Sequence, residues 1–378
     1  MNSYTGFNVK GKNMANRVTI QDIADALGLS RNTVSKAINN TGVLAEATKE
    51  KVLQKAMEMG YKTFSYANSQ ILNQAAGQAL NSSPVSADHP RREVALLTGI
   101  FLDNFHFAST MLDKLQNELS YLGYSMTIHR VMPEHFDALT LPLSFHQEST
   151  AAIICVEIFH HPYCQMLSTL GLPLLLVDAP VSTYAAPLPA DILLMENTSG
   201  IYQIVKKASE KGITKIGFVG QPTHCRSFFE RFMAFREAMY LYSLPVNNSF
   251  CLTDVHQHGM DYRIFLKEHI LKMKELPELF ICANDFVALD ILFILRDLGI
   301  SCPEDIMLSG FDNAPLSRIV TPPLTTCHIH SQIMGLSAAH LITSRIRQPD
   351  MNYRTMHTET ELLYRESTRK EFTDAKCI

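Results

Sequence analysis

The chain of 378 residues is longer than one ordinary domain and allows two or three. A hydrophobic fraction of 46% and a charged fraction of 19% exclude wholesale disorder. No apolar run reaches the roughly 18 residues that a membrane-spanning helix needs, and the N-terminus lacks the pattern of a signal peptide. We therefore expect a folded cytoplasmic protein without a membrane partner.

Charge is distributed unevenly along the chain. Residues 1–63 carry nine Lys and Arg against five Asp and Glu, whereas residues 64–378 carry 24 against 32. A small basic head on an acidic body favours an anionic partner for the head alone. Solvated helix surfaces would give the same charges, so composition leaves both interpretations open.

The region near the N-terminus predicts a helix, a turn and a second helix. Thr19 lies three residues before Asp22, a variant of the capping box that starts a helix. Gly28 then permits a turn, and Ser30 is a good N-cap for a second helix over 31–38. A third helix follows these two and completes a small bundle.

The second helix has one apolar and one polar face. Val34, Ala37 and Ile38 face the bundle. The outward face carries Arg31, Asn32, Ser35 and Lys36. Arg and Asn side chains can make paired hydrogen bonds to guanine and adenine, and Ser and Lys suit phosphate oxygens. This face predicts a DNA-binding helix-turn-helix, with a merely polar three-helix bundle as the alternative.

The chain from Glu93 onward alternates short apolar runs with amphipathic patterns. The apolar runs include 94–98, 151–156, 173–177, 215–220, 279–283 and 306–310. The helical patterns between them include 108–122, 199–211, 228–241 and 286–298. Nearly continuous apolar strands separated by helices indicate buried parallel sheets built from βαβ units. The pattern is too long for one small sheet, so we predict an α/β body with two lobes.

Small, polar and Pro-interrupted segments mark the boundaries between these parts. We predict a disordered arm, a helix-turn-helix domain, a hinge with a linker, a two-lobed domain for effector binding and dimerisation, and a tail, at residues 1–15, 16–63, 64–92, 93–368 and 369–378.

Polar residues that follow the predicted strands are candidates for a ligand site. Two-lobed parallel α/β proteins bind small molecules between the lobes, near the carboxyl ends of the strands. Asn284 and Asp285 follow the strand at 279–283, where Asp285 is either a ligand contact or a helix cap, and Asp178 follows the strand at 173–177. The aromatic residues that could stack on a ligand ring, or simply pack, are Phe105, Phe107, Phe159 and Tyr184.

The chain shows no pattern of a metal site or of a common catalytic site. The close groups of possible metal ligands are His160 and His161 with Cys164, His256 with His258, and His328 with His330. None has the spacing of a structural zinc site, and the eight cysteines include no Cys-x-x-Cys pair. The nucleophile-elbow, P-loop and dinucleotide-binding patterns are also missing. We predict reduced thiols, no metal, no cofactor and no enzymatic activity.

Several stretches together resemble the LacI/GalR family of bacterial transcription regulators. The DNA-binding head of that family is similar to VTIQDIADALGLSRNTVSKAINNTGVLAEATKEKVLQKAMEMGY. Its effector domain, which has a periplasmic-binding-protein-like fold of type I, is similar to ICANDFVALDILFILRDLGISCPEDIMLSGFDN, PPLTT and ELLYREST. The resemblance covers roughly residues 16–368.

The resemblance implies roles for individual residues. Arg31 and Asn32 occupy base-reading positions, and Lys36 lies where the family usually has a base-contacting Arg. The implied DNA-binding set is Thr19, Ser30, Arg31, Asn32, Thr33, Ser35, Lys36 and Asn39, in which Thr19, Thr33, Ser35 and Asn39 match phosphate contacts. Asp285 matches a residue that binds effector hydroxyls, and Arg231 matches an effector-contacting Arg. Asp178 matches a common family Asp near the cleft. Together with the residues chosen for their place after predicted strands, the candidate effector site comprises Asp285, Asn284, Arg231, Phe105, Phe107, Phe159, Asp178 and Tyr184.

The chain departs from the family in the hinge. Thr63 stands where the family's hinge helix usually begins with Pro. Gln70 stands where ungapped counting places the Leu that wedges into the minor groove, and Ile71 or Leu72 would serve after a slip of one or two residues. We therefore expect this hinge to bend DNA weakly.

The sequence predicts a homodimeric, ligand-responsive repressor of transcription. Two heads are expected on a pseudo-palindromic operator in double-stranded DNA, because one short head contacts too few bases. A small-molecule effector controls the protein; a carbohydrate is the default, and a nucleobase or another metabolite is an alternative. The competing classes are a solute-binding protein and a sugar-processing enzyme with an appended head.

Overall fold

The computed structural model describes residues 19–39, 92–99, 107–255 and 261–368, together with six positions between 45 and 56. The chain separates into two compact units, Met1–Pro84 and Val85–Ile378. Each unit is described by itself.

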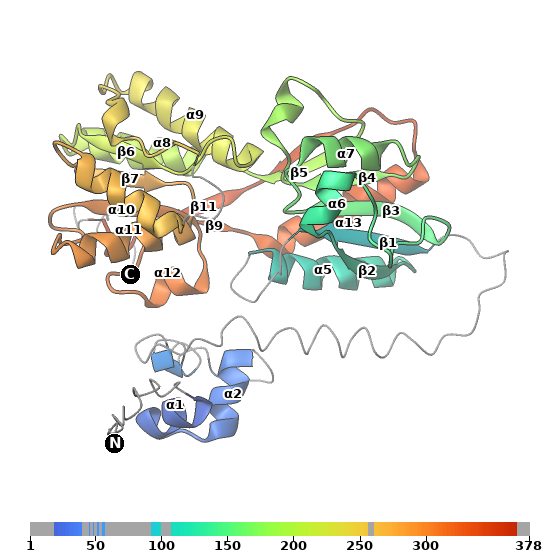
Figure 1. Cartoon of the computed structure of the whole chain (residues 1–378), viewed down its shortest axis with the longest axis horizontal. Coiled ribbons are helices and arrows are strands. Elements are labelled where there is room, and N and C mark those ends of the chain that lie inside the picture. The colour runs from blue at the N-terminus through green and yellow to red at the C-terminus, as the bar shows by residue number, and fades with distance from the viewer. Residues whose placement is uncertain are drawn as a thin grey trace, which may run out of the picture. The chain divides into compact units, whose positions relative to one another are not determined.

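The first unit contains the predicted helix-turn-helix, drawn in blue in Figure 1. α1 (Ile20–Leu27) and α2 (Arg31–Asn39) are joined by a turn at Gly28, whose φ of 63° is left-handed and unstrained for glycine. Positions 48, 51, 52, 55 and 56 are helical and lie where the third helix was predicted. The core consists of Ile23, Ala24, Val34, Ala37, Val52 and Ala56. Val34 and Ala37 belong to the predicted apolar face of the second helix.

The second unit contains two sheets, which Figure 1 shows with their helices. The first sheet has the order β10-β5-β4-β3-β1-β2 and is parallel throughout. Its strands are β1 (Glu93–Thr98), β2 (Ser125–Arg130), β3 (Thr150–Val156), β4 (Leu174–Val177), β5 (Asp191–Met195) and β10 (Thr355–Thr358). We call this sheet lobe A, together with α5 (Phe107–Tyr121), α6 (Pro133–Ala138), α7 (His161–Ser168), the short helix η3 (Val181–Tyr184) and α13 (Ser331–Arg347).

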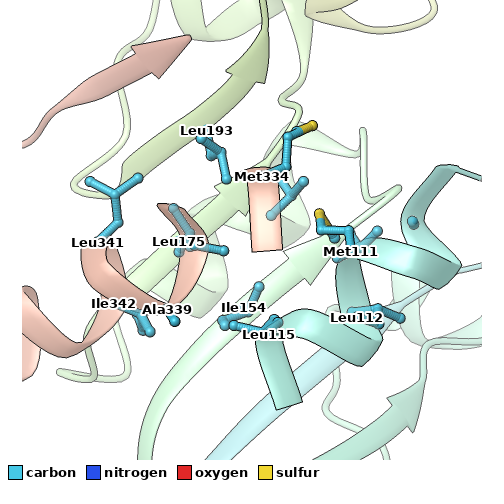
Figure 2. Close-up of a cluster of buried hydrophobic side chains, with 14 of the residues drawn as sticks. Met111, Leu112, Leu115, Ile154, Leu175, Leu193, Met334, Ala339, Leu341 and Ile342 are labelled. Carbon is cyan, nitrogen blue, oxygen red and sulfur yellow. The ribbon is translucent and has the colours of Figure 1, made fainter. Parts of the chain in front are cut away.

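Helices cover both faces of the sheet in lobe A. Figure 2 shows one face, where Met111 and Leu115 of α5 and Met334 of α13 pack beside Ile154 and Leu175 of the sheet. The opposite face packs against Tyr163, Cys164 and Leu167 of α7. Burial on both faces explains why β1, β3, β4 and β5 are almost continuously apolar.

The second sheet has the order β11-β9-β8-β7-β6, and β11 alone is antiparallel to its neighbour. Its strands are β6 (Ile216–Val219), β7 (Leu279–Cys282), β8 (Met307–Asp312), β9 (Thr325–Ile329) and β11 (Thr360–Leu363). We call this sheet lobe B, together with α8 (Ser199–Glu210), α9 (Arg226–Leu241), η4 (Asn248–Phe250), α10 (Tyr262–Lys272), α11 (Asp285–Asp297) and α12 (Pro315–Ile319). Helices α8 and α9 cover one face, and α10 and α11 cover the other.

The chain passes between the lobes three times, after β5, after β9 and after β10. Each crossing leaves the carboxyl end of a parallel strand, so these ends of both sheets meet at the junction between the lobes. Polar residues that follow β3, β4, β7 and β8 therefore come to this junction. The predicted α/β class with two parallel-sheet lobes is confirmed.

A buried charge cluster fixes β10 beside β5 and α13. Asp191 has no exposed surface and pairs with Arg345 and Arg354 at 3.0 Å each. Burial raises the pKa of Asp191, but the hydrogen bonds from both arginines lower the pKa below its ordinary value. Removing one partner of such a buried pair costs about 3–5 kcal/mol, so the cluster firmly positions the third crossing.

Candidate functional site

Side-chain caps determine where α1 and α2 begin. The N–H and the hydroxyl of Thr19 each lie 2.7 Å from Asp22 Oδ2, and the hydroxyl accepts from Asp22 N–H at 3.3 Å. This confirms the predicted capping box. The Oγ atom of Ser30 accepts from Thr33 N–H at 3.0 Å and caps α2 as predicted. The first turn of α2 is therefore held by hydrogen bonds within the head.

The polar face of α2 lies outward. Arg31, Asn32 and Lys36 are exposed, and Thr33 and Ser35 are half-buried. A guanidinium and an amide at the start of an exposed helix can hydrogen-bond to base edges in the major groove, and an ammonium suits phosphate. DNA contact by these residues remains a prediction. The side chain of Asn39 and the hinge residues Gln70, Ile71 and Leu72 lie outside the described residues.

Arg231 is buried at the junction between the lobes. Its exposed fraction is 2%. Its Nε donates to Asn197 Oδ1 at 3.0 Å, and its Nη1 donates to the carbonyl of Ala283 at 2.6 Å. The guanidinium also lies 3.5 Å from the centroid of the Phe311 ring. The guanidinium of Arg231, a predicted effector contact, is therefore fixed by two hydrogen bonds and one aromatic ring.

Asp312 is a candidate site residue that the sequence analysis did not identify. It ends β8 with a φ of 108°, and Asn313 follows with a φ of 54°. Such backbone conformations are uncommon outside glycine and cluster at functional sites. Asp312 Oδ1 lies 3.9 Å from Arg231 Nη1. The sequence did contain a signal for this site: Asp312 and Asn313 form a polar pair after a predicted strand, as Asn284 and Asp285 do.

Asp285 is fully buried and bound within lobe B, and its contact with an effector stays a prediction. It has no exposed surface, its Oδ1 accepts from the Thr326 hydroxyl at 2.6 Å, and its Oδ2 accepts from Ala314 N–H at 2.7 Å. Burial and the nearby Asp312 raise the pKa of Asp285 to about 7. The carboxyl group joins α11 to β9 and to the loop after β8.

Asn284 provides the cap of α11 that was considered for Asp285. Its Oδ1 accepts from Val287 N–H at 2.9 Å. This hydrogen bond satisfies one of the free N–H groups of the first turn. The effector contact that was expected of Asn284 remains untested by this geometry.

Asp178 joins the two lobes. It follows β4, is 6% exposed, and accepts from Ala179 N–H at 2.8 Å and from Ser227 N–H at 3.2 Å. Ser227 belongs to the first turn of α9 in lobe B. Burial raises the pKa of Asp178 to about 6.

Two predicted aromatic residues of lobe A also reach the junction. Tyr184 is 49% exposed, and its hydroxyl donates to Glu230 Oε1 at 2.7 Å. The ring of Phe159 lies 5.1 Å from the ring of His224 in lobe B. Phe105 and the side chain of Phe107 lie outside the described residues.

The described residues carry no other evident chemical centre. Within them, no three His, Cys, Asp or Glu side chains are grouped so that they could hold a metal ion. Seven cysteines in this part of the chain are free thiols, and His160 caps α7 by accepting from Tyr163 N–H. None of the helices described is long and apolar enough to cross a membrane.

Known proteins match both the head and the body. Residues 19–63 match the bacterial regulatory proteins of the lacI family, and residues 205–368 match a periplasmic binding protein-like domain. The HTH-type transcriptional repressor PurR of Vibrio vulnificus (strain CMCP6) is 25% identical over 356 residues, which cover 93% of this chain and 99% of the relative. This chain belongs to the LacI/GalR family. It is a DNA-binding transcription regulator with a helix-turn-helix head.

Solved structures share the fold of this LacI/GalR protein. The transcriptional regulator CelR–cellobiose complex has a TM-score of 0.63 at 20% identity and covers 93% of this chain and 100% of that chain. The lac repressor dimer bound to operator and the anti-inducer ONPF has a TM-score of 0.62 at 18% identity, with 93% and 99% covered. These similarities support the predicted periplasmic-binding-protein-like body.

Proposed function

We propose that this LacI/GalR protein is a ligand-responsive repressor that binds a pseudo-palindromic operator as a homodimer. The observation that carries the proposal is an exposed Arg31-Asn32 pair at the start of a capped helix, in a chain whose body buries Arg231 beside Asp312 in lobe B, next to the first crossing between the lobes. The first feature suits base reading, and the second suits a small-molecule response. The head, the hinge with its linker, and the body span residues 16–63, 64–92 and 93–368.

The homodimer is proposed because one reading helix covers only a short half-site. Two heads related by a two-fold axis read two half-sites in successive turns of the major groove. The lac repressor dimer bound to operator, whose fold this chain shares, supports this arrangement. Since it acts on the chromosome, the protein works in the bacterial cytoplasm.

The proposed effector is an uncharged molecule rich in hydroxyl groups, such as a carbohydrate. Arg231 and Asp312 place donors beside an acceptor, and their opposite charges offset each other, which suits a ligand without net charge. The half-exposed ring of Tyr184 can stack on a sugar ring. The CelR–cellobiose complex supports this ligand class. The remaining proposed contacts are Phe105, Phe107 and Phe159, with Asp178, Asn284 and Asp285 as supporting residues.

The two competing classes have less support. A solute-binding protein has no use for a helix-turn-helix, and residues 19–63 match the lacI family of regulatory proteins. A sugar-processing enzyme is also disfavoured, because the curated relative that spans 93% of the chain is named a transcriptional repressor. A turnover assay on the sugars that bind tests the enzyme class directly.

The test of DNA reading is selection from a random-sequence DNA pool with the full-length protein. A palindromic consensus is expected. Arg31→Ala should weaken binding to that consensus by about 1–3 kcal/mol and relax one base position. Arg31→Lys retains the charge but loses the two-pronged hydrogen bonding, so it should relax the same position. Equal losses on consensus and random DNA would instead assign Arg31 to the phosphate backbone.

The test of the ligand response follows on the selected operator. A panel of mono- and disaccharides is added to the protein–operator complex, and bound DNA is measured by fluorescence anisotropy. At least one saccharide should change operator affinity. Asp312→Asn should reduce this response without changing operator affinity in the absence of saccharide. A response only to charged metabolites would contradict the proposed effector class.

A further inference from the structure

Glu230 of α9 receives hydrogen bonds from both lobes. Its side chain is 12% exposed. From lobe A, the Tyr184 hydroxyl donates to Oε1 at 2.7 Å, and His357 Nε2 lies 3.4 Å from Oε2. Asn197, in the first crossing, donates to Oε2 at 2.7 Å, and Arg226 of the same helix donates to Oε1 at 3.0 Å. One carboxylate thus joins α9 of lobe B to η3 and β10 of lobe A.

The Glu230 carboxylate carries its full charge near neutral pH. Burial raises the pKa of Glu230, but hydrogen bonds from His357, Asn197 and Tyr184 lower it by more than burial raises it. The resulting pKa is about 2. Hydrogen bonds to an ionised acceptor are about twice as strong as those between neutral groups. The contacts from lobe A are therefore of the stronger kind.

The backbone at the start of α9 is also attached to lobe A. Arg226 N–H donates to the carbonyl of Ala179 at 2.8 Å, and Ser227 N–H donates to Asp178 Oδ1 at 3.2 Å. N–H groups in the first turn of a helix have no partner within that helix. These two hydrogen bonds consequently form only when the lobes are in contact.

Asn197 connects this contact to the proposed effector site. Its amide is 1% exposed, donates to Glu230 and accepts from Arg231 Nε. A change in the position of Glu230 therefore moves the amide that orients Arg231, the partner of Asp312.

We infer that the first turns of α9 form a latch between the lobes, in which Glu230 is the positioning residue. We define the latch as Arg226, Ser227 and Glu230 of lobe B with Asp178, Tyr184 and His357 of lobe A. The latch holds the lobes closed and keeps Arg231 aligned. The expected effect on the effector rests on the proposed function. A weaker latch leaves a smaller fraction of molecules closed, and the apparent effector affinity falls in proportion to that fraction.

The same helix offers a matched control. The Tyr202 hydroxyl donates to Glu237 Oε2 at 2.8 Å, and both residues belong to lobe B. Tyr184→Phe and Tyr202→Phe each remove one tyrosine hydroxyl from one glutamate of α9. Only the first removes a contact between lobes, and it leaves the ring in place beside Arg226, whose Cζ lies 4.3 Å from the ring centroid.

The experiment measures hydrogen–deuterium exchange of the full-length protein, without DNA or added saccharide, with fragmentation that resolves single amides. Glu230→Gln should speed exchange of the Arg226 and Ser227 amides about tenfold, which corresponds to about 1.4 kcal/mol. Tyr184→Phe should speed the same two amides by a smaller factor. Tyr202→Phe and Glu237→Gln should leave both amides at the wild-type rate.

Two results would overturn the latch. One is wild-type exchange of the Arg226 and Ser227 amides in both Glu230→Gln and Tyr184→Phe. The other is faster exchange along the whole of α9, including residues 235–241, which would mean that the variants loosen the helix and not the contact between lobes. Neither result depends on operator or effector binding, so failure of the latch is distinguishable from failure of the proposed function.

Discussion

At the scale of single residues, buried carboxyl groups link the stability of the body to pH. Burial raises the pKa of Asp285 to about 7 and that of Asp178 to about 6, whereas the pKa of Glu230 is lowered to about 2. Raised and lowered values act in opposite directions. Asp285 and Asp178 favour folding at lower pH, and Glu230 favours folding above its ordinary pKa of 4.5.

Asp285→Asn should flatten the dependence of thermal stability on pH. Between its ordinary pKa of 3.8 and its folded value of about 7, Asp285 keeps a proton in the folded state that the unfolded chain has lost. Rising pH through this window therefore favours unfolding, and Asn removes that contribution. The measurement is the melting temperature of the full-length protein between about pH 5 and about pH 7.5, a window that avoids the titration of Glu230.

The control for this measurement is Asp297→Asn, which changes an exposed carboxyl at the other end of α11. The control should keep the wild-type slope of melting temperature against pH. A wild-type slope in Asp285→Asn as well would show that the Asp285 carboxyl does not carry a raised pKa in the folded protein.

At the scale of elements, α11 and β8 approach closely because Gly310 has no side chain. A Cβ atom at this position would lie 2.2 Å from Asp285 Oδ1 and 3.1 Å from Asp285 Cα. The second distance involves backbone, which cannot rotate away as a flexible side chain can. The close approach allows Asp285 to reach both Thr326 and Ala314.

Gly310→Ala should lower the free energy of unfolding of the body by about 1–3 kcal/mol, the usual cost of inserting a carbon into a packed interior. The helix would have to shift away from the strand, and the hydrogen bonds of Asp285 would lengthen. Urea denaturation measures the change. Gly99→Ala is the control, because its nearest heavy atom would lie 3.4 Å away. Equal stability of wild type and Gly310→Ala would mean that a Cβ atom fits between β8 and α11, and would contradict their close approach at Gly310.

At the scale of the whole molecule, charge and symmetry restrict how the protein meets DNA. Residues 1–63 carry a net positive charge, whereas residues 64–378 carry an excess of eight acidic groups. Phosphate therefore attracts the head, and the body contributes repulsion. In the proposed homodimer, the body joins two heads and so converts two short contacts into one specific site.

Operator affinity should depend on the spacing of the half-sites. Inserting five base pairs at the centre of the selected operator turns the second half-site by about half a helical turn, away from the second head. Affinity should fall toward that of a single half-site. An insertion of ten base pairs should return the second half-site to the same face of the DNA, but the two half-sites then lie further apart. Anisotropy titrations on the three operators measure this. Affinity that is indifferent to spacing would contradict a dimer that reads two half-sites together.

Local patterns were sufficient for the elements whose signal lies within a few residues. The Thr19 capping box, the turn at Gly28 and the outward Arg31-Asn32 pair depend on neighbours in the chain, and the structure shows the predicted geometry for each. The predicted runs that became the buried strands β3, β4, β6, β7 and β8 are almost continuously apolar. Strands β2 and β10 are mostly exposed or half-buried and contain polar residues, so no apolar run marked them.

Only the tertiary structure decided which polar residues face one another. The position of Asp285 left a ligand contact and a helix cap open, and the structure gives the cap to Asn284 and joins Asp285 to Thr326 and Ala314. Arg231 meets Asp312, and Tyr184 meets Glu230, across separations of 81 and 46 residues. Sequence periodicity reports the face of an element but not the element it meets. These pairs arise because three crossings bring the carboxyl ends of two sheets together, which depends on the packing of the entire body.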